Sequence, residues 1–177
     1  MLKDKIINHK DKQIYYKTKK YLEKNKDKEI DKKMKVIESV LNIKDTQERY
    51  IYLYDLICEY LDNEFVNKNV CGFNCGICKR RQEMIDKNIK KDTYLDGCCH
   101  GYKNGNCKYL IPGKGCSIKN IACKLYTCFY LKKQGISYNL NNIYLSRYFF
   151  NYRQKFHIEN TFFVDKDVVM EGILKYR

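Results

Sequence analysis

The sequence predicts a mostly α-helical protein whose helices pack around an irregular, loop-rich segment dense in cysteine. Three observations support this fold class. Apolar residues recur every three or four positions across residues 45–67, which is the period of a helix. Nine of the ten cysteines and seven of the nine glycines lie between residues 71 and 128, where glycine interrupts any long element. The sequence shows no alternation of strands and helices, which is the pattern that would indicate a parallel sheet.

Residues 1–35 predict a basic helical arm, because they carry 13 lysines against 6 acidic residues (net +7) and few apolar positions. This composition is typical of a solvated helix pair or of one helix with a frayed arm, and it also suits an arm that binds nucleic acid. Residues 36–70 predict amphipathic helices that pack on the cysteine-rich segment. Within them Asp45 and Glu48 have capping-box spacing, and Cys58 lies on the apolar stripe as a core residue.

The cysteine-rich segment, residues 71–128, predicts loops and short helices, including one helix from Lys79 to Lys91. Residues 129–177 predict C-terminal helices that complete the same domain. One of these helices is expected from about Asn142 to His157, and a short final helix is expected after a capping residue, Asp165.

Composition places the chain among soluble globular proteins. It has 177 residues, 44% of them hydrophobic, and a formal net charge of +14. No stretch reaches the roughly 18 consecutive apolar residues of a membrane span, and the polar start lacks the apolar core of a signal peptide. We therefore expect a cytoplasmic protein without a membrane span. Because the cytosol is reducing, clustered thiols there indicate metal binding or redox chemistry more than disulfides.

The cysteines of residues 71–128 are the candidate metal ligands, because a metal centre needs several thiolates within a few ångströms of one point. Two four-cysteine sites would need eight ligands, so nine candidates leave one to spare. Only the first three offer the short turns of a zinc site, and dispersed single cysteines after them favour a 4Fe-4S iron–sulfur cluster slightly over Zn²⁺. The candidates are Cys71, Cys75, Cys78, Cys98, Cys99, Cys107, Cys116, Cys123 and Cys128.

The first three candidates, Cys71, Cys75 and Cys78, form a C-x3-C-x2-C motif. This spacing is shared with radical S-adenosylmethionine enzymes, which hold three irons of a cluster in this way. The resemblance ends at the motif, since those enzymes place it early in a long β/α barrel, and this chain has no strand–helix alternation.

A second resemblance covers about residues 71–128. The motifs are Gly97-Cys98-Cys99, Cys107-Lys108-Tyr109-Leu110, Gly115-Cys116-Ser117-Ile118 and Cys123-Lys124. This run resembles the family of zinc- or iron-chelating cysteine-cluster proteins, some of whose members are flagellin lysine N-methylases. The resemblance implies metal binding by Cys98, Cys99, Cys107, Cys116 and Cys123, together with a cysteine of the first triplet.

Several functions stay open from the sequence. The first is a metal-binding protein with a structural, redox or sensing role. A second is a nucleic-acid-binding protein with a structural metal module, whose contacts come from Lys79, Arg80, Arg81, Lys119 and Lys124 and whose partner could equally be an acidic protein. A third is a metal-cluster enzyme, such as a methyltransferase or a radical S-adenosylmethionine-like protein. No arrangement of nucleophile, base and orienting residue is visible, so catalysis is left undecided.

Overall fold

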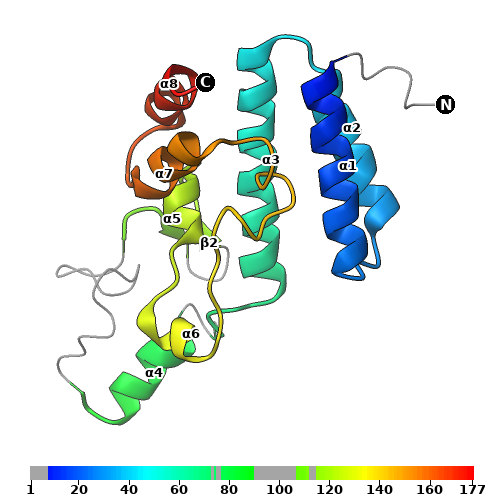
Figure 1. Cartoon of the computed structure of the whole chain (residues 1–177). Coiled ribbons are helices and arrows are strands. Elements are labelled where there is room, and N and C mark those ends of the chain that lie inside the picture. Colours follow the sequence, from blue (N-terminus) through cyan, green and yellow to red (C-terminus); the bar gives the residue numbers. More distant parts are fainter. Residues whose placement is uncertain (1–7, 73, 75–76, 90–106, 112–114) are drawn as a thin grey trace.

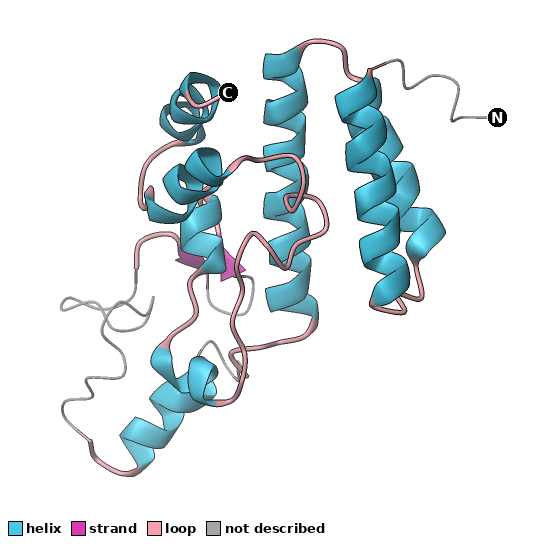
Figure 2. Ribbon diagram, in the orientation of Figure 1, coloured by secondary structure: helices cyan, strands magenta, loops and turns pink. Residues whose placement is uncertain are grey.

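The computed structural model describes residues 8–72, 74, 77–89, 107–111 and 115–177, and in these residues the protein is mostly helical, as predicted. A long central helix lies between an N-terminal helix pair and a group of short C-terminal helices (Figure 1). The strands form a small antiparallel hairpin in which Leu110 pairs with Cys116 (Figure 2). The elements are α1 (His9–Lys24), α2 (Ile30–Asn42), α3 (Thr46–Asn67), α4 (Lys79–Asp86), β1 (Leu110–Ile111), β2 (Gly115–Cys116), α5 (Ile121–Leu125), α6 (Phe129–Lys133), α7 (Tyr152–Asn160) and α8 (Lys166–Lys175).

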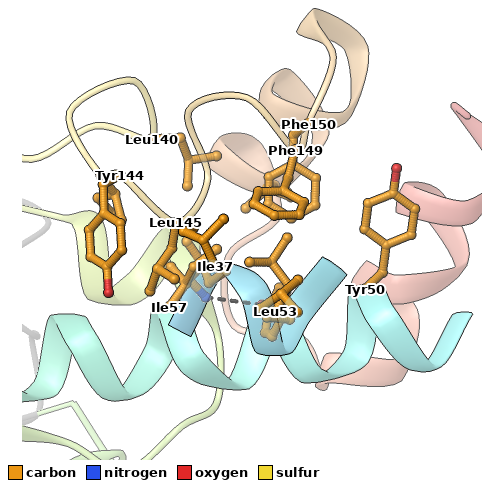
Figure 3. Packing of buried hydrophobic residues seen from close by; sticks show 14 of the residues in the cluster. Ile37, Tyr50, Leu53, Ile57, Leu140, Tyr144, Leu145, Phe149 and Phe150 are labelled. Carbon is orange, nitrogen blue, oxygen red and sulfur yellow. Dashed lines mark hydrogen bonds between the residues drawn. The ribbon is translucent and has the colours of Figure 1, made fainter. Parts of the chain in front are cut away.

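Helix α3 is the centre of the hydrophobic core, and its start is the one predicted. The Asp45 carboxylate accepts the Glu48 backbone N–H at 2.8 Å, which satisfies a free donor in the first turn. The predicted apolar stripe is buried from Tyr50 to Leu61, including Cys58 at 4% exposure, and its last residue, Phe65, is half-buried. Side chains from α2 and from residues 140–150 pack on this stripe, and the Phe150 ring stacks on the Tyr50 ring with centroids 5.6 Å apart (Figure 3).

The N-terminal residues form a helix pair, α1 and α2, which is one of the two arrangements predicted for them. The pair is more than a solvated arm, because α1 buries Ile14, Tyr15 and Leu22. Its first turn is tied to α3 by Asp11, whose carboxylate lies 2.9 Å from the Arg49 guanidinium. Asp11 is 5% exposed, so this ion pair is largely removed from water.

The expected helix from Asn142 to His157 is wrong in its first half. Residues 140–150 are turns, and α7 begins at Tyr152 after a capping box formed by Asn151 and Gln154. Ile143, Tyr144 and Leu145 are consecutive and all buried. A surface helix would turn at least one of three consecutive residues toward water, so this run favours a packed loop.

Helix α4 is shorter than the predicted Lys79–Lys91 helix and ends at Asp86. Asn88 adopts a left-handed backbone conformation with φ of 49°, which ends the helical hydrogen-bond series. The final helix begins after Asp165, as predicted, although the Asp165 side chain makes no capping hydrogen bond.

Candidate metal centre

Backbone hydrogen bonds hold Cys71 close to Cys78 in the fold. Asn74 and Ile77 exchange backbone hydrogen bonds at 2.9 and 3.0 Å, and the Lys79 N–H donates to the Cys71 carbonyl at 3.1 Å. Gly72 adopts φ of 57°, a left-handed conformation that most residues avoid. These contacts therefore hold the first and last cysteines of the C-x3-C-x2-C motif at one place in the fold.

Cys78 is the N-cap of α4, and its sulfur accepts the Arg81 backbone N–H at 3.4 Å. The thiol is 6% exposed. Burial raises the pKa of Cys78 above its ordinary value, the Arg81 N–H lowers that pKa, and the nearby Cys128 thiol raises it again. The sulfur thus sits where backbone donors favour negative charge while burial opposes a bare thiolate. Burial keeps the thiol neutral, and coordination to a cation is one way in which a protein stabilises a buried thiolate.

Cys128 is the second buried cysteine at this place, although 50 residues separate it from Cys78 in the sequence. It is the N-cap of α6, so both short helices begin at a cysteine of the same region. A contact between the helices lies beside the thiols. The Arg80 guanidinium pairs with Glu83 at 3.4 Å and lies over the Tyr130 ring, and the Tyr130 hydroxyl donates to Glu83 at 3.1 Å.

Sequence patterns gave no signal for this contact, since Glu83 and Tyr130 are 47 residues apart. The contact links α4 to α6, and so it also positions the cysteines that cap these two helices. A backbone hydrogen bond therefore places Cys71 beside the start of α4, and Cys128 lies near enough to Cys78 to affect its pKa.

Three of the other candidate ligands lie elsewhere on the chain. Cys107 is buried just before the β1–β2 hairpin, and Cys116 is part of β2. Cys123 lies in α5, and its sulfur accepts the Phe163 backbone N–H at 3.4 Å. The remaining candidates, Cys75, Cys98 and Cys99, lie outside the described residues.

A complete metal-binding module is not visible in the part of the chain that the structure describes. Within that part, no three side chains of the cysteine, histidine, aspartate and glutamate types are grouped as metal ligands would be. The nine-cysteine ligand set and the choice between iron–sulfur and zinc therefore stay predictions.

The predicted cationic surface of the cysteine segment is smaller than the sequence indicates. Lys124 is 5% exposed, and its ammonium pairs with Asp62 of α3. Lys119 lies 3.9 Å from Asp55, which also receives two hydrogen bonds from Lys166 at 2.8 Å. Burial of Lys124 depends on a partner 62 residues away, so local sequence could not have revealed it.

None of the known protein families, curated proteins or solved structures compared with this chain matches it. The resemblance to the cysteine-cluster family therefore rests on the cysteine motifs alone. Among the described helices, none is both long and apolar enough to cross a membrane.

Proposed function

We propose that the protein binds a metal through Cys71, Cys78 and Cys128, and that the centre has a structural role. The observation that carries the proposal is that two buried cysteines, Cys78 and Cys128, are the N-caps of helices far apart in sequence and lie near enough for one thiol to affect the pKa of the other. The fourth thiolate is predicted from the motif spacing to be Cys75. Either Zn²⁺ or a 4Fe-4S cluster accepts four cysteine ligands.

A structural role is supported by how little apolar surface α4 and α6 bury. Of the residues in these two helices, only Met84 and Leu131 are buried. Two buried side chains contribute roughly 3–6 kcal/mol. Fixing the backbone costs about 1–2 kcal/mol per residue, and α4 and α6 contain 8 and 5 residues. A structural zinc site contributes about 10–16 kcal/mol, which is of the size needed.

The test is the metal content and visible absorption of protein purified without oxygen. Iron with acid-labile sulfide and a brown colour identifies a cluster, whereas a colourless protein with stoichiometric zinc identifies a zinc site. Cys78→Ser and Cys128→Ser should each lose the metal. The matched control is Cys58→Ala, which also removes a buried thiol but should keep the metal.

Hydrogen exchange separates a structural role from a peripheral one. With metal bound, the amides of α4 and α6 should be protected, and a chelator should remove that protection while the amides of α3 keep theirs. Unchanged metal content in both cysteine variants, or a parent protein without metal, would refute the ligand assignment. Unchanged protection after metal removal would refute the structural role alone.

A further inference from the structure

Helix α1 presents a face of lysines to solvent. Lys10, Lys17, Lys20 and Lys24 are all exposed and follow one another at intervals of seven, three and four residues. At 3.6 residues per turn these positions fall within an arc of about 80° around the helix, and at 1.5 Å per residue the row is about 21 Å long. The four ammonium groups therefore lie along one line of a rigid element, which lies on the far side of α3 from α7 and α8 (Figure 1).

The acidic residues of α1 do not neutralise this row. Asp11 is buried and paired with Arg49, and Glu23 lies 3.8 Å from Lys19. In the following turn, Asp27 and Glu29 are paired with lysines of α2. Throughout the described residues, no carboxylate forms an ion pair with any of the four lysines of the row.

We infer that this lysine row binds the phosphate backbone of double-stranded nucleic acid without reading its sequence. A duplex carries one negative charge per about 1.7 Å of its axis, so a rigid row of this length faces several phosphates at once. Lysine is a compact point charge that pairs with phosphate without demanding one geometry. Contacts of this kind position a protein on nucleic acid and carry no sequence information.

Two other polyanionic partners fit the row less well. An interfacial helix inserts an apolar face into the lipid, but the apolar face of α1, with Ile14 and Leu22, is already buried in the protein. A protein partner would require a desolvated core of aromatic or apolar side chains, and the row consists of lysines.

The size of the effect follows from counterion release. Neutralising four phosphates gives a slope of about −3.6 for the logarithm of affinity against the logarithm of salt concentration. Raising the salt from about 50 to about 200 mM should then weaken binding about 150-fold. Removing the four charges should abolish most of this salt dependence.

The experiment measures binding of the full-length protein, as purified, to a fluorescent mixed-sequence DNA duplex of about 20 base pairs over that salt range. The test variant is K10Q/K17Q/K20Q/K24Q, because glutamine keeps the helix propensity of lysine. The control is K35Q/K44Q/K87Q/K175Q, which lowers the net charge equally at four exposed lysines outside α1. Circular dichroism checks that both variants keep their helices.

Binding of duplex nucleic acid by the lysine row is supported if the parent and the control bind with a slope near −3.6, while the α1 variant loses at least 100-fold in affinity at low salt. Equal losses in both variants would overturn it, because binding would then follow net charge and not this face. It would also be overturned if the parent bound no duplex at low salt, or bound only vesicles of anionic lipid.

Discussion

Replacement of Gly172 by alanine should destabilise the protein, although Gly→Ala inside a helix ordinarily stabilises by about 1 kcal/mol. Gly172 lies in α8 against the ring of His157 in α7. A Cβ atom added there would lie 2.0 Å from Nε2, 2.3 Å from Cε1 and 2.5 Å from Cδ2 of that ring. Real Cβ contacts are not that short, so the ring or the helix must move.

The cost follows from what holds the ring. His157 Nε2 lies 3.2 Å from the Val169 carbonyl oxygen, and the ring lies against Tyr176 with centroids 5.9 Å apart. Swinging the ring outward gives up a hydrogen bond of about 1 kcal/mol and a ring contact of about 0.5–1.5 kcal/mol. After the helix-propensity gain, the expected net loss is about 1 kcal/mol, or roughly 2–4 °C in Tm for a chain of this size.

The assay is thermal and urea unfolding of a double-mutant cycle. In a His157→Ala background the obstacle is absent, so Gly172→Ala should stabilise by about 1 kcal/mol, giving a coupling near 2 kcal/mol. Gly135→Ala is the control, because φ of 76° strains any side chain there while nothing lies within 4 Å of the added atom. Its cost should not depend on His157. A higher Tm for Gly172→Ala alone would refute the reasoning.

Three further changes test other parts of the structure. Arg49→Met should lower the free energy of unfolding in urea by about 3–5 kcal/mol, because Asp11 would be left buried and unpaired; a loss below about 1 kcal/mol would contradict this. Burial raises the pKa of Cys58 from 9.0 to about 12, so its contribution to stability is complete below pH 9 and is lost as the pH rises toward 12. Alkylation of Cys58 at pH 8 should therefore require unfolding, and rapid labelling of the folded protein would refute its burial. Asn120→Ala should cost about 3 kcal/mol in thermal unfolding, since it removes the cap of α5 and two donors to carbonyl groups before α8; Asn120→Asp keeps the cap but buries a carboxylate oxygen against those two carbonyl oxygens, so it should cost more than Asn120→Ala.

Local patterns predicted the parts of the fold that local forces decide. The period of residues 45–67 and the Asp45 cap predicted α3, since one face of that helix is buried and its first turn is capped by its own neighbour. The helix expected from Asn142 fails because its apolar residues are consecutive and pack as a loop on α3. Periodicity indicates which face is buried only when another face meets water.

The candidate site likewise has a part that local sequence predicts and a part that depends on long-range contacts. The proximity of Cys71 and Cys78 is local, since the two are only seven positions apart, as the motif spacing predicts. The approach of Cys128 depends on the contact of Glu83 with Tyr130, which no local pattern encodes. The burial of Lys124 is equally non-local, and it removes one cation from the surface that the sequence predicts.

The distribution of buried apolar residues gives a physical reason for the positions of the capping cysteines. Leu53, Ile57 and Leu61 of α3 are fully buried, so the helical body has a core that needs no cross-link. Helices α4 and α6 lack such a core, and each of them begins at a buried cysteine, Cys78 or Cys128. If this is correct, metal removal should loosen α4 and α6 and leave α1 in place. Metal-free protein should then still bind duplex DNA through its lysine row, and loss of binding on metal removal would mean that the two parts do not fold independently.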